Sequence, residues 1–183
     1  MAYKKIDPAK AYRLLNSGSL LLICTKNKKG EDNMAPVAWT CPVEYDPTTE
    51  IVIVCDRNHQ TYRNIVSLKH FVACIPHASQ KDIVVKTGSV SGEKINKIEQ
   101  FNIKTILSPS LKIKVPVGCI GFIECRLIKT IRHRNSAILI GQAIGAMAGR
   151  NAFTDRLLSE KKEGRTLHHL GANIFITTGR LIK

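Results

Sequence analysis

The sequence is poor in aromatic and acidic residues, and it has no long apolar run. Aromatic residues make up only 5% of the 183 residues, against 44% hydrophobic residues overall, so aliphatic side chains are expected to fill the core. No stretch approaches the ~20 apolar residues of a transmembrane helix. The opening MAYKKIDPAKAYRLLNSG lacks the apolar stretch and cleavage site of a signal peptide. We therefore predict a cytoplasmic protein with no membrane span, folded as one domain over residues 1–183.

Cysteine is present without the spacing of a metal site or of a disulfide framework. The six cysteines include no CxxC pair, and the chain is not a short secreted one with regular cysteine spacing. Cys74 and His77 could supply two metal ligands, but nothing nearby completes a set, so no metal is predicted. Four cysteines lie in apolar, strand-like runs, which predicts buried, reduced thiols that act as small hydrophobes: Cys24, Cys55, Cys74 and Cys125.

Signatures of nucleophilic catalysis and of phosphate-binding loops are also missing. The sequence has no G-x-S-x-G elbow and no cysteine beside a histidine in a recognisable local signature. The stretch GQAIGAMAG meets neither the GxGxxG nor the Walker spacing, so its glycines are better explained by close backbone packing at a barrel corner. These absences argue against nucleophilic catalysis and against a dinucleotide-binding α/β fold.

The charge balance is strongly basic. Lys and Arg number 28 against 14 Asp and Glu, a formal net charge of +14. Such a charge raises nucleic acid as a partner, yet the basic residues are spread along the chain and do not alternate with aromatic residues that could stack on bases. Nucleic acid is therefore disfavoured. A solvated basic surface, and attraction for small anions or for an acidic protein, both stay open.

Short apolar runs bounded by turn residues predict a mostly β fold. We expect helices over residues 7–18, 61–69 and 94–101, with another beginning near residues 79–82, and Asp7 and Thr61 as caps. Residues 102–117 and 149–166 are expected to be connections, and the tail is expected to add extended structure. The pattern predicts a small antiparallel barrel with several short peripheral helices. The expected strands cover residues 19–25, 33–40, 50–55, 70–75, 118–134 and 136–148.

An uncharged stretch, residues 33–43, contains the only tryptophan, Trp39. Pro36 and Pro42 restrict the backbone on either side of Trp39, so the segment between them is expected to be extended. An extended, incompletely paired backbone could offer N–H and C=O groups to a planar heterocycle, with Trp39 as a wall. The alternative is an edge strand whose prolines block aggregation. Residue chemistry leaves both interpretations open.

The segment DRNHQTYRNI, residues 56–65, is predicted to end a strand and begin a helix. The first amides of a helix point outward and attract anions. With Arg57, His59, Thr61 and Arg63 nearby, the segment is a candidate phosphate site. The alternative is an ordinary helix start with solvated charges.

The order of these features resembles the flavin reductase-like family, the FMN-binding split barrels that include flavoredoxin. The resemblance runs from about residue 20 to residue 145. The turn Arg132-His133-Arg134-Asn135 departs from the Gly-Asp-His of many relatives, and Asn96-Lys97-Ile98 departs from their Asp-Lys-Phe. The matching positions are Thr25, Gly30, Asn33, Pro36, Trp39, Asp46-Pro47, Arg57, Thr61, Asn64-Ile65, Ser91, Gly92, Lys97, Phe101, Glu124-Cys125 and Gly141.

The resemblance implies an antiparallel split β-barrel that binds FMN, forms a homodimer and transfers hydride or electrons through flavin N5. The reductant would be NAD(P)H or a small electron-transfer protein such as ferredoxin. Residues 39–43 would line the isoalloxazine ring with Asn33, and residues 57–61 would take the phosphate. A non-enzymatic basic module that binds nucleic acid or an acidic protein is the alternative. The implied cofactor-binding residues are Asn33, Pro36, Trp39, Thr40, Cys41, Pro42, Val43, Arg57, Asn58, His59, Thr61, Asn64, Ser91 and Gly92.

Overall fold

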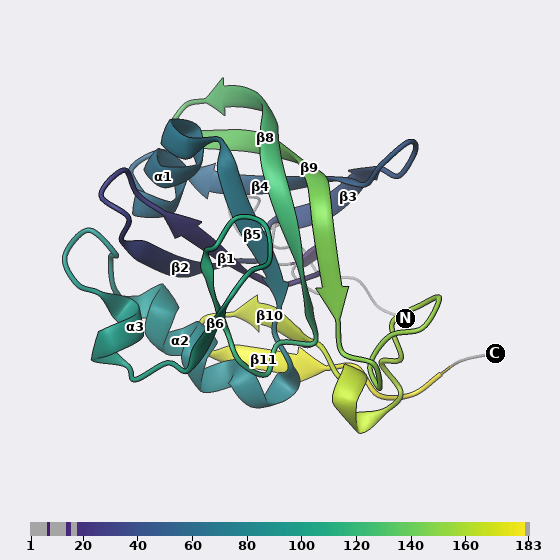
Figure 1. Cartoon of the computed structure of the whole chain (residues 1–183). Coiled ribbons are helices and arrows are strands. Elements are labelled where there is room, and N and C mark those ends of the chain that lie inside the picture. Colours follow the sequence, from purple (N-terminus) through teal and green to yellow (C-terminus); the bar gives the residue numbers. More distant parts are fainter. Residues whose placement is uncertain (1–6, 8–13, 16–17, 182–183) are drawn as a thin grey trace.

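Strands dominate the computed structural model, which describes residues 7, 14–15 and 18–181 (Figure 1). The helix expected over residues 7–18 lies largely outside the described residues. Seven strands form one sheet in the order β2-β1-β5-β8-β9-β4-β3, and two further pairs form small hairpins. The strands are β1 Leu21–Lys26, β2 Asp32–Val37, β3 Thr40–Glu44, β4 Glu50–Asp56, β5 His70–Ile75, β6 Thr105–Leu107, β7 Lys114–Pro116, β8 Gly121–His133, β9 Ser136–Ala148, β10 Leu167–Gly171 and β11 Ile174–Thr177.

The sheet curls because its two edge strands are consecutive in the chain. Only Ala38 and Trp39 separate the end of β2 from the start of β3, although these strands occupy opposite edges of the sheet. All pairings within the sheet are antiparallel. The amide of Val54 in β4 donates to the carbonyl of Trp39 at 2.9 Å, which fixes the connection against the far edge. The result is the predicted antiparallel split barrel.

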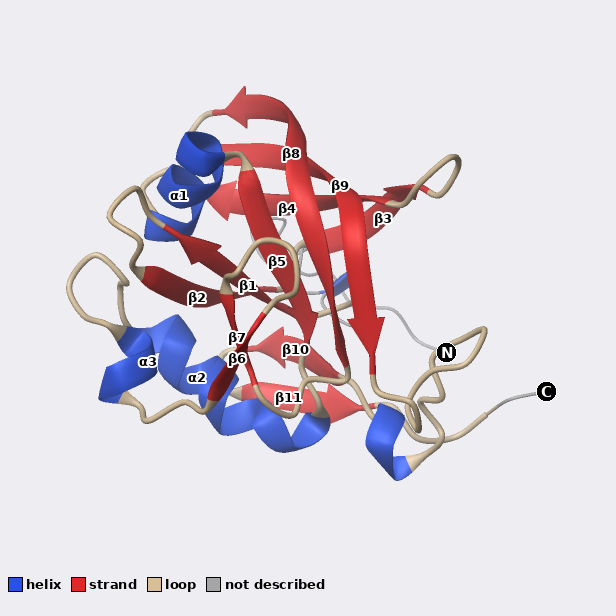
Figure 2. Ribbon diagram, in the orientation of Figure 1, coloured by secondary structure: helices blue, strands red, loops and turns tan. Residues whose placement is uncertain are grey.

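Short helices lie outside the sheet, as predicted (Figure 2). The α-helices are α1 Gln60–Leu68, α2 Lys81–Ser89 and α3 Lys97–Gln100, and 3-10 turns cover Ala78–Gln80 and Lys162–Gly164. No helix in the described part of the chain is long and apolar enough to cross a membrane.

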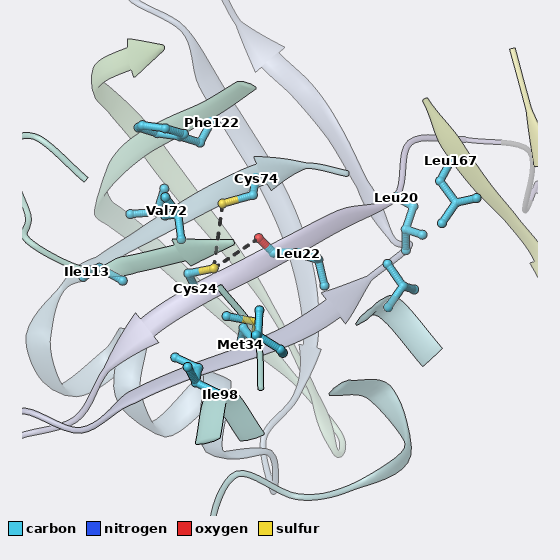
Figure 3. Packing of buried hydrophobic residues seen from close by; sticks show 13 residues of the cluster. Leu20, Leu22, Cys24, Met34, Val72, Cys74, Ile98, Ile113, Phe122 and Leu167 are labelled. Atoms are coloured by element: carbon cyan, nitrogen blue, oxygen red, sulfur yellow. Dashed lines mark hydrogen bonds between the residues drawn. The ribbon is translucent and has the colours of Figure 1, made fainter. Parts of the chain in front are cut away.

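Two apolar clusters occupy the two faces of β1, which is buried on both sides. Leu22 and Cys24 belong to the cluster that α2, α3 and β7 cover (Figure 3). Leu21 and Ile23 belong to the other cluster, inside the barrel. The four cysteines predicted to be buried thiols are all buried and free, and the sulfurs of Cys24 and Cys74 lie 3.7 Å apart. Because both faces of β1 are buried, consecutive residues of the strand are apolar instead of alternating with polar ones.

Glycine in β9 allows the barrel to close tightly, as expected for GQAIGAMAG. A Cβ at Gly141 would lie 2.6 Å from Cε1 of Phe71 and 3.1 Å from Cβ of Cys125. Both neighbours are fully buried, so no side chain fits at position 141 without displacing the core.

One predicted helix cap is wrong. The N-cap of α1 is His59, not Thr61, which lies inside the helix and is only 3% exposed. The helix predicted to begin near residues 79–82 is present: the imidazole of His77 accepts the amide of Ser79 at 3.1 Å and caps the 3-10 turn Ala78–Gln80, and α2 follows this turn directly. The cap residues differ because burial and local hydrogen bonds outweigh the statistical preference for serine and threonine.

Two further differences concern segments between the main strands. Residues 102–117, expected to be a plain connection, contain the β6–β7 hairpin, in which Ile106 pairs with fully buried Val115. The stretch expected to be extended over residues 33–40 is interrupted after Val37, where the chain crosses from one sheet edge to the other. The tail does form extended structure, as the β10–β11 hairpin.

Candidate functional site

Two adjoining cavities lie where the β2–β3 connection, the start of α1 and the end of α2 meet. The larger has a volume of about 720 Å³ and the smaller about 310 Å³. They share six lining residues: Ala35, Pro36, His59, Thr61, Gly88 and Ser89. The larger cavity extends to the end of β4 and to the β10–β11 hairpin, and the smaller extends to residues 90–92. Volumes of this size suit a cofactor or a small organic ligand.

The uncharged stretch divides between the larger cavity and the sheet edge. Pro36 and Trp39 line the larger cavity, and Trp39 is 51% exposed. The four residues after Trp39 lie instead in edge strand β3, which pairs with β4, and they line neither cavity. The second half of the stretch is therefore an edge strand, whereas the first half borders the larger cavity. The edge-strand half consists of Thr40, Cys41, Pro42 and Val43.

Asn33 carries the one buried side-chain polar atom without a partner in the described residues. Its side chain, in a residue 6% exposed, donates from Nδ2 to Thr61 Oγ1 at 3.3 Å, whereas Oδ1 has no partner. Both residues line the smaller cavity, together with Ser91 and Gly92. A Cβ at Gly92 would lie 2.7 Å from Asn33 Cγ and closer still to Oδ1, so the backbone there approaches the amide closely. A buried acceptor left without a donor usually marks a ligand or an ordered solvent site.

The start of α1 borders both cavities, as the phosphate interpretation requires. His59 and Thr61 line both, Gln60 lines the smaller one, and the first turn of α1 contains no acidic residue. The first amides of a helix lack acceptors within the helix, so they are free to bind an anion.

Three other predicted residues line neither cavity and have polar groups that bond to neighbouring residues. Arg57 Nη1 donates to the carbonyl of Arg134 at 3.0 Å, and the amide of Asn58 donates to Asp56 Oδ1 at 2.8 Å. Asn64 is buried, donates to Thr25 Oγ1 at 3.0 Å and accepts from Gln60 Nε2 at 2.6 Å. Asn64 therefore holds α1 against β1, and none of the three residues lines either cavity.

Buried Lys97 also lines the smaller cavity, although it was not among the predicted binding residues. Lys97 is 4% exposed, and its Nζ donates to the carbonyls of Met34 at 3.1 Å and Thr87 at 2.6 Å. Burial lowers the pKa of Lys97 to about 8. Lys97 is among the positions that match the family pattern, and this match is the signal in the sequence that could have identified it as a cavity residue.

The β10–β11 hairpin forms the remaining wall of the larger cavity through His169, Ala172, Asn173 and Phe175. The rings of His169 and Phe175 lie 5.2 Å apart between centroids, at a tilted angle. His169 Nε2 also bonds with the carbonyl of Ala172 at 2.8 Å. Nothing in the sequence marked these residues, because the hairpin approaches the cavity only in the folded chain. No group of three His, Cys, Asp or Glu suited to a metal ion occurs among the residues described.

A curled antiparallel sheet with a cleft at the crossing of its two edges defines a split-barrel domain. The chain belongs to the flavin reductase-like family: the pattern of the flavin reductase like domain matches residues 14–168. It is 31% identical to the protein YddH of Escherichia coli (strain K12) over 176 residues, which is 94% of this chain and 93% of YddH. The predicted family is therefore confirmed.

Solved structures agree on the fold. An FMN-binding domain of a flavin reductases-like enzyme from Shewanella baltica OS155 has a TM-score of 0.80 at 24% identity, covering 97% of this chain and 95% of that one. Flavoredoxin of Desulfovibrio vulgaris (Miyazaki F) has a TM-score of 0.84 at 18% identity, covering 100% of this chain and 96% of that one. Both likenesses extend over almost the whole of each chain.

Proposed function

We propose that this chain, as one domain over residues 1–183, binds FMN in the two adjoining cavities and acts as an oxidoreductase of the flavin reductase or flavoredoxin type. The observation that carries the proposal is the unpartnered Oδ1 of Asn33, buried in a cavity that the start of α1 also borders. FMN binding by the Shewanella baltica domain and the family membership support it.

The residues of the smaller cavity fit a phosphate monoester. The first amides of α1, the hydroxyl of Thr61 and the segment at Ser91 would donate hydrogen bonds to phosphate oxygens. The ammonium of Lys97 would add positive charge nearby, and the net charge of +14 would favour the dianion at longer range. Donors of this kind bind FMN more tightly than riboflavin, which lacks the phosphate.

The walls of the larger cavity fit a flat ring system. Pro36 limits backbone movement, and Trp39 and Phe175 supply aromatic surface on different elements. When bound, FMN would supply hydride or electron transfer at its N5 atom. The role of this chain would be to hold and orient the ring and to limit its contact with water, so we assign no side chain as an acid or base.

Exposed apolar side chains near the cleft support a homodimer. Trp39 and Val43 are each 51% exposed and Tyr45 is 85% exposed, all on or beside edge strand β3. Clustered exposed apolar side chains mark interaction surfaces. We propose a cytoplasmic homodimer with the flavin near the subunit interface, reduced by NAD(P)H or by a small electron-transfer protein such as ferredoxin. Light scattering coupled to size-exclusion chromatography tests the dimer, and a monomer at micromolar concentration would contradict it.

The alternative, a non-enzymatic basic module for nucleic acid or an acidic protein, makes opposite predictions. It requires a colourless protein whose affinity for nucleic acid falls steeply with salt. The flavin proposal requires visible absorption bands that bleach on reduction. A visible absorbance scan of the purified protein, before and after dithionite, separates the two. Family membership favours the flavin proposal.

A further inference from the structure

A short segment between α2 and α3 lies over the buried side chain of Asn33. We call residues 90–93 the cover segment; its first three residues line the smaller cavity. Gly92 is so close to Asn33 that a Cβ at position 92 would lie 2.7 Å from Asn33 Cγ. Movement of the cover segment would therefore change access to the unpartnered Oδ1 of Asn33.

The cover segment is bonded mainly to itself. The amide of Glu93 donates to Ser91 Oγ at 3.3 Å, and the amide of Lys94 donates to the carbonyl of Ser91 at 3.1 Å. Among the residues that the structure describes, its one hydrogen bond to another element runs from Arg63 Nη2, on α1, to Glu93 Oε2 at 2.7 Å. Segments with few bonds to the rest of the fold open at a low free-energy cost, so this contact has a large share in keeping the segment closed.

The guanidinium of Arg63 is held in place by the start of α1. Its Nη1 donates to the carbonyl of Asn58 at 3.0 Å, and its Nε and Nη2 donate to Gln60 Oε1 at 3.3 and 3.1 Å. Gln60 is itself fixed, because its Nε2 donates to Asn64 Oδ1 at 2.6 Å. A guanidinium oriented in this way loses little further freedom when it pairs with Glu93. The pair thus joins two walls of the smaller cavity, the start of α1 and the cover segment.

The Arg63–Glu93 pair differs from the other salt bridges of the described residues by joining segments that are not neighbours in the chain. Its side chains are 41% and 62% exposed, so it contributes little to the stability of the whole fold. It can still bias the local opening of a segment that has few other bonds. The other two pairs link residues four or six positions apart: Lys26–Asp32 and Arg156–Glu160.

We propose that Arg63 and Glu93 are positioning residues that hold the cover segment over the smaller cavity and thereby set the rate at which FMN leaves. This inference rests on the proposed function, because it takes FMN as the ligand. Neither residue lines a cavity, so each would act through the cover segment, which places Gly92 against Asn33 and Ser91 at the phosphate site.

The first test is the rate of FMN release, followed by the return of flavin fluorescence when FMN-loaded protein is diluted in a stopped-flow instrument at low salt. Glu93→Gln, which keeps the shape without the charge, and Arg63→Met should each release FMN about threefold faster than the wild type, within the range measured for exposed ion pairs. The double variant should release FMN no faster than the faster single variant, because both substitutions remove the same contact. At about 1 M salt, where charges are screened beyond roughly 3 Å, the difference from the wild type should narrow.

Two controls separate positioning from general effects. Glu99→Gln removes the same charge from an exposed position on α3 and should release FMN as the wild type does. The flavin-free variants should melt at the wild-type temperature, whereas a residue with only a structural role would lower the melting temperature without a specific effect on FMN release.

The second test needs no flavin. Trypsin cleavage after Lys94, an exposed residue beside the cover segment, follows the fraction of molecules in which the segment is open. In flavin-free Arg63→Met protein this cleavage should be about threefold faster than in the wild type, and cleavage after Arg150 should be unchanged.

Release of FMN at the wild-type rate from both single variants would overturn the inference, as would equal acceleration by Glu99→Gln. A wild-type chain that does not bind FMN would contradict the proposed function instead. Cleavage after Lys94 would then decide the role of the pair: faster cleavage in Arg63→Met would support its hold on the cover segment, and unchanged cleavage would exclude it.

Discussion

Replacing Gly92 with alanine should weaken flavin binding by displacing Asn33. The new methyl group would lie 2.7 Å from Asn33 Cγ and 3.5 Å from Nδ2, and closer still to Oδ1. Carbon atoms pack best at roughly 3.5–4.0 Å, so either the amide must rotate or the segment at residues 89–93 must move. Rotation breaks the 3.3 Å bond from Asn33 Nδ2 to Thr61 Oγ1 and removes the unpartnered oxygen from the cavity.

The expected cost has two parts. Overpacking a filled site lowers the free energy of unfolding by about 1–3 kcal/mol. Loss of one or two hydrogen bonds to the ligand weakens FMN binding about tenfold or more, since each tenfold corresponds to about 1.4 kcal/mol. Thermal melts report the first part, and quenching of flavin fluorescence on titration reports the second. The control is Gly179→Ala, because a Cβ at Gly179 meets nothing within 4 Å.

A second variant separates crowding from loss of the acceptor. Asn33→Ala removes the amide without adding a methyl group at position 92, and it should weaken FMN binding to a similar degree. Folded Gly92→Ala and Asn33→Ala proteins that both bind FMN within about twofold of the wild type, a difference of only about 0.4 kcal/mol, would refute a role of the Asn33 amide in FMN binding.

Three other variants test separate parts of the structure. Thr61→Ala should weaken the binding of FMN more than that of riboflavin in the same fluorescence titration, because the lost hydroxyl would donate to the phosphate. Equal losses of affinity for both ligands would count against a phosphate site at Thr61. Gly141→Ala should lower the melting temperature by about 2–4 °C per kcal/mol lost, since its Cβ would lie 2.6 Å from Phe71 Cε1, and an unchanged melt would refute the packing. Glu124, 2% exposed, accepts the amides of Ser110 and Leu111 at 2.9 and 2.7 Å. Burial by itself would raise the pKa of Glu124, but hydrogen bonds led by that from Leu111 leave it lowered. The carboxylate therefore stabilises the fold above its unfolded pKa of about 4.3 and loses this effect as pH falls through the lower folded value. In urea titrations Glu124→Gln should be less stable than the wild type at neutral pH and approach it in acid, and a gap independent of pH would contradict this.

Local sequence signals predicted the large elements of the fold. The strand at residues 70–75 and the turn between β8 and β9 lie where apolar runs and turn residues placed them. The β6–β7 hairpin was missed because its strands have three residues each and depend on tertiary packing around Val115. The N-cap of α1 was predicted wrongly because Thr61 is the second residue of the helix, where its buried hydroxyl accepts a hydrogen bond from Asn33.

The candidate site was predictable only where a family pattern linked distant segments. Asn33, Thr61 and Gly92 are far apart in the sequence, and their meeting depends on how β2, α1 and the segment after α2 pack. The guanidinium of Arg57 donates to the carbonyl of Arg134, which lies 77 residues further along the chain. Periodicity and local chemistry carry no information on such contacts, so these features required the folded chain.

We propose that the cavities around Asn33 and Thr61 hold FMN, and the other proposals depend on this binding. Its most direct test is a titration of the purified, flavin-stripped protein with FMN, followed by flavin fluorescence and visible absorbance. We expect saturable binding at one FMN per chain, with weaker binding in Asn33→Ala. A folded protein that leaves the fluorescence and absorbance of added FMN unchanged at every concentration would contradict it.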